Sequence, residues 1–554
     1  MRLKKFYYSV MGRSLKFIIT YTVLTLVINI NTYAQDFHSN FNSGKAAYEQ
    51  KKYNQAIQKL QTARLQGQEA VGDTDPDYIL AIEYLALSYQ AQKDLGNANI
   101  YFQSLEKLLK KSGNGESEKM LSTQLQVADN SLVMKNFPQA DIYYRNAITT
   151  AEKVFGKDSK QYTSTFHKHA QLYVIGRKYK EADGMYRTLE PMAEKYLKGT
   201  PEFATILSEQ ADVSMGMKRV EEASIQLSMA IKAFEGTNTP KSSYVNLYLK
   251  EATLLEKNGD NQGAIKAYNI YIDNLGKAYG IDNKKYITEV DRLAVHYDMK
   301  LHSPMDAYSL VKKKLAANNK KFGESSLESA ATRIELAEME IEQNNIPAAK
   351  ANTEKAISIY DSKGKATSPE GIAASITMAR IFGHNNMKSE AEAAYKKAIA
   401  DTEKSLGQKH TTYGKALDSL AFFYIETKRF ADAEEAIQKG MTAREKSVGK
   451  QHIDYGNSLY SLSMLYASQD SLEKAEKTLI QVAKVREAYY GALTLEHATC
   501  IKELGDLYKD MGEEKSAAAL KTYRRAITLY EGIGLKKSDM VKDIYKSIDD
   551  INTR

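Results

Sequence analysis

Small residues recur along the chain at a nearly constant interval. Successive members of one series are separated by 41 to 43 residues, and mostly by 42. Each member opens an apolar pattern with the spacing of an amphipathic helix, often with an aromatic residue four positions later and another alanine seven positions later. The series is Ala56, Ala98, Ala140, Ala182, Ala223, Ala264, Ala307, Ala349, Ala391, Ala433 and Ala475, with a twelfth copy at Ala519 after a longer loop.

A second series of small residues precedes the first, usually by twelve positions. Two antiparallel helices approach closely only where side chains are small, and large residues three and four positions away fill the space beside the contact. One such pair cannot bury its apolar face alone, so neighbouring pairs must stack. The pattern therefore predicts an all-α array of about twelve helix pairs. The second series is Gly44, Ala86, Ala128, Ala170, Ala211, Ala252, Ala294, Ala337, Ala379, Ala421, Ser463 and Gly505.

Helix-breaking residues agree with these boundaries. Pro138, Pro304 and Pro347 fall two or three residues before the alanine of their units, where the N–H groups of a first helical turn have no helical partner. In six units a glycine lies 16 residues after the alanine, where the second helix should end in a left-handed cap. These glycines are Gly156, Gly280, Gly323, Gly407, Gly449 and Gly491.

The repeated residues resemble the tetratricopeptide repeat (TPR), whose usual period is about 34 residues. A 42-residue period is similar to the variety found in kinesin light chains. The linkers Gly407-Gln408-Lys409-His410 and Gly449-Lys450-Gln451-His452 resemble that family's Gly-x-x-His linker. The resemblance covers about residues 41–535 and implies a right-handed α-solenoid of about twelve TPR-like hairpins. It also implies that the first helix of each pair lines a concave side, where such arrays hold peptides or partner segments.

The N-terminus does not follow the repeat. Residues 2–16 carry five basic side chains and no acidic one, an apolar run continues to Ile30, and small residues precede Gln35. This order predicts a signal peptide over residues 1–34, and therefore an exported protein, periplasmic or secreted. The apolar run is shorter than the roughly 20 residues of a membrane span, so we expect no stable membrane span after cleavage. The repeat array should then occupy residues 35–535, and a capping helix residues 536–554.

Charge and candidate chemistry narrow the function classes. Loss of the five N-terminal basic residues lowers the net charge from +8 to +3, too weak to favour nucleic acid or an anionic membrane. No phosphate loop, nucleophile arrangement or metal-ligand cluster occurs, so we expect no enzyme, cofactor or metal. His167 and His169 point about 200° apart on one helix and cannot share a metal. His410 and His452 belong to separate units, and Cys500, the only cysteine, is expected to be a buried structural thiol.

The first helices offer a candidate binding face. If the second series marks position 8 of each unit, positions 5, 9 and 12 should face the concave side, which we call the predicted face. Acidic side chains outnumber basic ones there, so a peptide with basic and apolar side chains would fit. The alternative is a solvated wall, with binding at the edges or ends. The candidate contacts are Asp129, Asp212, Asp291, Asp298, Glu338, Ile376, Arg380, Asp418, Phe422, Tyr460 and Met464.

Two functions follow from these features. The first is an exported, non-catalytic scaffold or adaptor that binds protein or peptide partners. The second is a regulatory or sensor module that controls a separate effector, such as a peptidase or kinase. Glycan binding is a further possibility because the chain has 38 tyrosines, although many of them occupy repeat packing positions. The sequence leaves the partner and the oligomeric state open.

Overall fold

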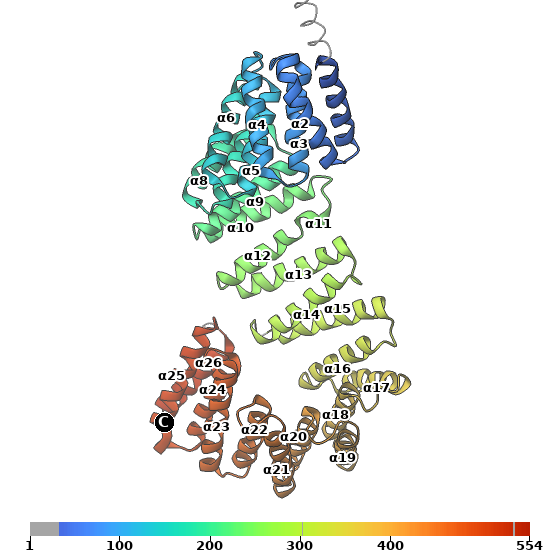
Figure 1. The fold of residues 1–554 in the computed structure, drawn as a ribbon. Helices are drawn as coiled ribbons and strands as arrows, with labels where there is room; N and C mark the ends of the chain where they lie inside the picture. The colour runs from blue at the N-terminus through green and yellow to red at the C-terminus, as the bar shows by residue number, and fades with distance from the viewer. Residues whose placement is uncertain (1–32, 302, 536–537, 554) are drawn as a thin grey trace, which may run out of the picture. The chain divides into compact units, whose positions relative to one another are not determined.

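The architecture is entirely helical over the part of the chain that is described. A computed structural model describes residues 33–301, 303–535 and 538–553, in which helices follow one another in packed antiparallel pairs without any strand (Figure 1). This confirms the predicted all-α solenoid of TPR-like hairpins. The predicted signal peptide lies, apart from residues 33–34, outside the described residues.

The chain divides into two compact units. Unit 1 ends at Gly259 and unit 2 begins at Asp260. In unit 1, a helix over residues 33–49 is followed by α2 (Tyr53–Ala70), α3 (Pro76–Ala91), α4 (Leu95–Lys111), α5 (Glu118–Val133), α6 (Phe137–Phe155), α7 (Lys160–Ile175), α8 (Tyr179–Tyr196), α9 (Pro201–Gly216), α10 (Val220–Glu235), α11 (Lys241–Tyr244) and α12 (Asn246–Lys257).

Unit 2 continues the same alternation of first and second helices. Its helices are α13 (Asn261–Tyr279), α14 (Lys284–Met299), α15 (Pro304–Phe322), α16 (Leu327–Glu342), α17 (Ile346–Ser362), α18 (Pro369–His384), α19 (Lys388–Ser405), α20 (Thr411–Glu426), α21 (Phe430–Ser447), α22 (Ile453–Ser468), α23 (Leu472–Tyr490), α24 (Leu495–Asp510), the 3₁₀ turn η1 (Glu513–Lys515), α25 (Ser516–Gly532) and α26 (Asp539–Asn552). The helix α26 spans the amphipathic stretch that was expected near the C-terminus.

Both predicted series of small residues lie where paired helices meet. The alanines of the second helices are buried, with Ala182, Ala391 and Ala433 fully inaccessible. Two first helices carry glycine instead, and there no room remains for a Cβ atom. A Cβ atom at Gly505 would lie 2.7 Å from Cδ1 of Tyr523, and one at Gly44 would lie 2.6 Å from Cγ of Leu60. Small side chains therefore set the distance between the two helices of a pair.

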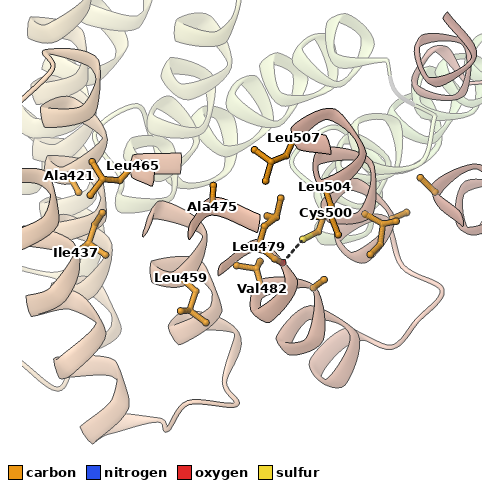
Figure 2. Close-up of a cluster of buried hydrophobic side chains, with 14 of the residues drawn as sticks. Ala421, Ile437, Leu459, Leu465, Ala475, Leu479, Val482, Cys500, Leu504 and Leu507 are labelled. Atoms are coloured by element: carbon orange, nitrogen blue, oxygen red, sulfur yellow. Dashed lines mark hydrogen bonds between the residues drawn. The ribbon is translucent and has the colours of Figure 1, made fainter. Parts of the chain in front are cut away.

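Large apolar side chains fill the space around these contacts. In unit 2 a continuous cluster includes Ala421, Ile437, Leu465 and Leu479 (Figure 2). Cys500 is fully buried in it, and burial raises the pKa of its thiol to about 12. Cys500 is therefore a core residue, because the thiolate that nucleophilic chemistry needs is strongly disfavoured.

Side-chain caps start most first helices. Asp75, Ser117, Ser159 and Thr200 each accept an N–H of the first turn in unit 1. In unit 2 the two linker histidines do the same, because Nδ1 of His410 accepts from the N–H of Thr412 at 3.2 Å. The equivalent bond runs from Asp454 to His452 at 3.2 Å. The Gly-x-x-His linker thus ends in an N-cap, which satisfies N–H groups that have no helical partner.

The glycines after the second helices differ in one respect from the prediction. All six have positive φ, between 76° and 96°. However, ψ is 145° to 163° at Gly156, Gly280, Gly323 and Gly491, so these residues are not left-handed helical. They adopt an extended positive-φ conformation that is almost restricted to glycine. At these four glycines the chain therefore leaves the second helix in an extended direction instead of in the predicted cap.

A tyrosine connects neighbouring units in a recurring way. The hydroxyl of Tyr424 in α20 donates to Glu392 in α19 at 2.9 Å, and Tyr508 in α24 donates to Glu476 in α23 at 3.0 Å. Tyr173 makes the same bond to Asp141 at 2.9 Å in unit 1. In each case the acceptor lies 32 residues earlier and directly follows the repeat alanine. These tyrosines hold successive hairpins in register, which accounts for part of the high tyrosine content.

Enlarging a repeat alanine should open a helix pair. We expect Ala391→Leu to lower the free energy of unfolding by about 1–3 kcal/mol, because the added atoms must displace the facing first helix. Ala393→Leu is the matched control, since Ala393 lies two residues further along the same helix and is exposed. Urea unfolding followed by circular dichroism measures both changes. Equal stability of the two variants would contradict the packing account.

Candidate functional site

All eleven predicted contact residues lie on first helices. Unit 1 contributes Asp129 on α5 and Asp212 on α9. Unit 2 contributes the others: Asp291 and Asp298 on α14, Glu338 on α16, Ile376 and Arg380 on α18, Asp418 and Phe422 on α20, and Tyr460 and Met464 on α22. The structure thus groups them on equivalent helices within each unit, but it gives their charged groups very different surroundings.

Several predicted acids pair with a cation of the chain itself. In unit 1, Nζ of Lys168 lies 2.8 Å from Asp129, and Nζ of Lys250 lies 2.6 Å from Asp212. Each lysine comes from the next first helix along the array. Asp129 also accepts the hydroxyl of Tyr144 at 2.6 Å. The acidic character that the sequence predicted for this part of the face is therefore largely neutralised.

The same pairing occurs in unit 2. Arg380 on α18 forms an ion pair with Glu338 on α16, so two predicted contact residues bind each other. Lys314 of α15 pairs with Asp291 and also with Glu335, at 2.8 Å. Asp298, in contrast, is exposed on α14. It lies close enough to Glu342 that, together with burial, its charge raises the pKa of that carboxyl.

Asp418 is withdrawn from the surface. Its residue is 9% exposed, and its carboxylate pairs with the guanidinium of Arg444 in α21 and accepts the hydroxyl of Ser458 in α22 at 3.1 Å. Burial raises the pKa of Asp418, whereas Arg444 and Ser458 oppose that shift. A Cβ at Gly414 would lie 2.4 Å from Nε of Arg444, so this glycine leaves room for the guanidinium. The three side chains join α20, α21 and α22 and are not directed at a ligand.

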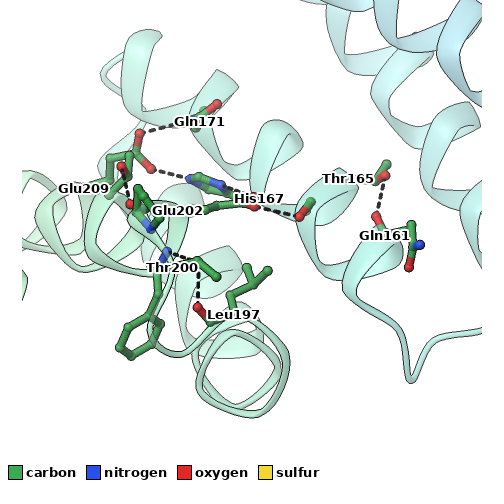
Figure 3. A network of polar contacts seen from close by, with 12 residues as sticks. Gln161, Thr165, His167, Gln171, Leu197, Thr200, Glu202 and Glu209 are labelled. Carbon is green, nitrogen blue, oxygen red and sulfur yellow. Dashed lines mark hydrogen bonds and ion pairs between the residues drawn. The ribbon is translucent and has the colours of Figure 1, made fainter. Parts of the chain in front are cut away.

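Another buried charge lies in unit 1. His167 on α7 is 4% exposed and lies between two carboxylates of α9, with Nδ1 3.1 Å from Glu202 and Nε2 2.7 Å from Glu209 (Figure 3). Glu209 also accepts the hydroxyl of Tyr186 at 2.7 Å and the amide of Gln171 at 2.8 Å. This network joins two neighbouring first helices and leaves no histidine nitrogen for a metal.

The network fixes the protonation of His167. Burial alone would disfavour the imidazolium, but the hydrogen bonds to Glu202 and Glu209 outweigh it and raise the pKa to about 9. His169, two residues away, behaves in the opposite way. Burial lowers its pKa, and its bond to Asp141 at 2.7 Å only partly offsets this effect. At neutral pH, His167 is therefore the charged member of the pair.

Two cavities open between first helices of unit 2. One of 400 Å³ is lined by Arg380, His384, Tyr395, Phe422 and Glu426 between α18 and α20. The other, of 290 Å³, lies between α22 and α24 and contains both Tyr460 and Met464. We call the second one the α22–α24 cavity. The remaining residues that line it are Ser463, Ala467, Ala475, Leu479, Glu503, Asp506, Leu507 and Asp510.

The α22–α24 cavity combines an apolar wall with carboxylates. Met464 is 39% exposed, and Leu507 continues its apolar surface. Asp506 is paired with Lys502 at 2.7 Å, whereas no ion pair involves Glu503 or Asp510 in the described residues. One oxygen of Glu503 accepts from Tyr460 at 2.9 Å, and the other is buried without a hydrogen-bond partner. Burial raises the pKa of Glu503, although the hydrogen bond from Tyr460 and the nearby charges of Arg486 and Lys502 oppose this shift.

Sequence reasoning missed half of this cavity. Tyr460 and Met464 were predicted from their repeat positions, but Glu503, Leu507 and Asp510 lie at other positions of the next first helix. Only the rotation of α24 against α22 brings these side chains together. The repeat positions of individual residues do not predict which side chains of two helices will line one cavity. The sequence did show several acidic residues on the second of these helices: Glu503, Asp506 and Asp510.

Other kinds of site find no support in the described residues. In that part of the chain no three His, Cys, Asp or Glu side chains are grouped to hold a metal ion. Among the helices described, none combines the length and apolar character that a bilayer crossing requires.

Comparison with known proteins agrees with the repeat. The family model of the tetratricopeptide repeat matches residues 412–483, which comprise α20 to α23. This chain is therefore similar to the tetratricopeptide-repeat family over these two helix pairs, α20 with α21 and α22 with α23. No curated protein matches its sequence.

Several solved structures are similar to this chain. Repeats of a putative kinesin light chain from Podosopora anserina are 19% identical, with a TM-score of 0.30, and cover 36% of this chain and 94% of that one. Yeast Tom70 is 13% identical, with a TM-score of 0.36, and covers 94% of this chain and 96% of its own. BtubC from P. vanneervenii is 13% identical, with a TM-score of 0.27, and covers 48% of this chain and 87% of its own. At these identities and TM-scores, individual residues of this chain cannot be matched to residues of those structures.

The charge on His167 should make unit 1 less stable at high pH. Its folded pKa of about 9 exceeds the ordinary value of 6.5, so its contribution is complete below about pH 6.5 and disappears as the pH rises through about 9. We expect His167→Gln to lower the free energy of unfolding by about 2 kcal/mol near neutral pH, a value reduced for the partial exposure of both glutamates. The difference from the unchanged protein should vanish near pH 10.

His169→Gln is the matched control for this titration. Because burial lowers the pKa of His169, its contribution is present above the ordinary histidine pKa and is lost only towards acid. Urea unfolding of the three proteins across this pH range measures both effects. A His167→Gln difference that stays constant up to pH 10 would show that the histidine is held neutral.

Proposed function

We propose that this chain is an exported, non-catalytic scaffold that binds a protein or peptide segment at the α22–α24 cavity of unit 2. The observation that supports this best is the combination of an apolar wall, with Met464 exposed, and two carboxylates, Glu503 and Asp510, that form no ion pair within the described residues. Elsewhere on the predicted face, acids such as Asp129, Asp212 and Glu338 are already paired within the chain. Export rests on the N-terminal sequence pattern alone.

The cavity suits one side chain of particular chemistry. A lysine or arginine of a partner can lay its aliphatic stem on Met464 and Leu507 and place its charged head between Glu503 and Asp510. The cation would favour the ionised form of Glu503, whose pKa burial now raises. Phe422 and the cavity between α18 and α20 offer a second apolar contact on the same unit, for a neighbouring residue of the segment.

A selection from a random peptide library tests this proposal. Peptides selected on the chain should be enriched in a lysine or arginine beside an aliphatic or aromatic residue. Fluorescence anisotropy with a selected, labelled peptide should then show that Asp510→Lys weakens binding about tenfold or more, because a repelled cation replaces an attracted one. Met464→Ser should weaken it by about as much through loss of the apolar wall.

The control variant changes charge without touching the cavity. Asp401→Lys introduces the same charge on α19, a second helix, at a residue that lines neither cavity. It should bind the selected peptide as the unchanged protein does. Peptides without a basic preference, or an unaltered affinity of Asp510→Lys, would overturn the assignment to this cavity.

A further inference from the structure

The turns between the two helices of each pair have an unexpected backbone conformation. In unit 1, five of these turns place a non-glycine residue at φ between 55° and 64°, always five positions before the repeat alanine. All five are basic: Lys51, Lys93, Lys135, Arg177 and Lys218. The equivalent non-glycine residues in unit 2 are Asn344, Asn386, Lys428 and Asp470. Positive φ is therefore a requirement of the turn, whereas a basic residue occupies all five of these turns in unit 1 but only the Lys428 turn among the four in unit 2.

Folding does not explain the choice of lysine or arginine. Asparagine, aspartate and glycine tolerate the left-handed region better than residues with long side chains. Unit 2 uses Asn344, Asn386 and Asp470 in the same turn, and Gly259 occupies it at the end of unit 1. Five basic residues at strained positions therefore indicate a role for their charge, since an observed outlier is a reason to look for function.

Three consecutive turns also expose apolar side chains. Val133 and Ile175 are the last residues of α5 and α7, and 71% and 57% of their surfaces are exposed. Met134 and Met217 are exposed beside Lys135 and Lys218. In unit 2 the residues at these two positions include polar pairs such as Glu426-Thr427 and Ser468-Gln469. Aliphatic side chains directly beside cations are thus concentrated in the third to fifth repeats.

The three turns are neighbours along one edge of unit 1. Hairpins stack in the same orientation, so equivalent turns lie side by side, separated by roughly the 10 Å spacing of packed helices. Direct contacts agree with this. Arg219, in the fifth turn, reaches back to Asp183 near the start of α8, and Gln92 of the second turn donates to Asn54 beside the first.

The cations of this edge are free to meet an external anion. Lys135, Arg177, Lys178 and Lys218 are exposed, and no ion pair involves them within the part of the chain that is described. Arg219, by contrast, is paired with Asp183 and Glu222. These four cations are therefore not neutralised by ion pairs within the described residues, while the exposed Glu181 and Glu221 follow them in the first turns of α8 and α10.

We propose that this edge, formed by Val133–Lys135, Ile175–Lys178 and Met217–Lys218, binds an anionic lipid surface. Lysine and arginine side chains attract lipid phosphates, and adjacent aliphatic side chains enter the boundary between headgroups and acyl chains. A nucleic acid would use the cations but would leave Val133 and Ile175 in water. A lipid surface is thus the ligand that would contact both the basic and the aliphatic side chains of this edge.

Vesicle co-sedimentation tests this proposal. The chain from Gln35 onward is used for every protein, so that the basic and apolar N-terminal residues do not contribute. It should bind vesicles of equimolar phosphatidylcholine and phosphatidylglycerol, and bind them more weakly as salt increases. The variant K135N/R177N/K178N/K218N should bind at least about 100-fold more weakly, since each cation near an anionic surface contributes severalfold. Asparagine keeps the left-handed turns and is a favourable helix N-cap in place of Lys178.

A charge-matched control distinguishes binding by this edge from non-specific attraction of any basic residues to the vesicles. K397Q/K404Q/K409Q/K428N removes four exposed positive charges from unit 2 and should leave vesicle binding unchanged. V133S/I175S/M217S should weaken vesicle binding about tenfold through loss of apolar insertion. Circular dichroism and thermal unfolding verify that each variant is folded.

Three outcomes would overturn the proposal. The first is that the unchanged chain does not bind anionic vesicles. The second is that the unit 2 control loses as much binding as the edge variant does. The third is that double-stranded DNA binds as strongly as the vesicles, with V133S/I175S/M217S without effect on either ligand. That last result would make the edge a polyanion site instead of a lipid site.

Discussion

The distance between the two helices of each pair governs the rest of this structure. It is set by the small residues of the two series, which let the backbones approach until a further Cβ, as at Gly505 or Gly44, would collide with the partner helix. A hairpin packed so closely has one regular shape. Copies of it can then stack on one another with the same rotation each time, so that positions 42 residues apart meet the same neighbours.

Regular stacking brings the polar groups of the chain within reach of one another. The hydroxyl of Tyr144 meets Asp129 on the first helix of its own pair, and Tyr424 meets Glu392 on the preceding pair. Lys168 and Lys250 reach the acids one repeat back. Each contact is individually modest, and exposed pairs contribute little to stability. Buried ones such as Asp418 with Arg444 are different, because a hairpin that slips out of register would leave an unpaired charge in the core.

These contacts between distant residues also explain which features of the structure could be predicted from the sequence and which could not. The alanine series, the capping glycines and the helix boundaries follow from local sterics, so Ala391 and Gly156 could be placed without a structure. The environment of Asp418 could not, since Arg444 lies 26 residues away and becomes its neighbour only after the turn between α20 and α21 has formed. The positive φ of Lys135 or Arg177 was equally hidden, because no side chain there carries the usual signal of glycine or asparagine. Division of the array at Gly259 likewise has no marker in the repeat, although α11 and α12 show that the first helix before it is interrupted.

Most polar side chains between neighbouring hairpins form hydrogen bonds or ion pairs within the chain. Few of them therefore remain to bind other molecules. Ligand sites should therefore lie where self-pairing fails, and a count of charged residues on a face is a poor guide to them. On the predicted face the exceptions are Asp298, exposed on α14, and Glu503 and Asp510, which line a cavity with an apolar wall. On the turns of unit 1 the exceptions are lysine and arginine residues with positive φ, a conformation that asparagine adopts more easily. Both exceptions share one physical property, a charged group that forms no ion pair with any other described residue, and that property distinguishes a binding surface from a wall that merely faces water.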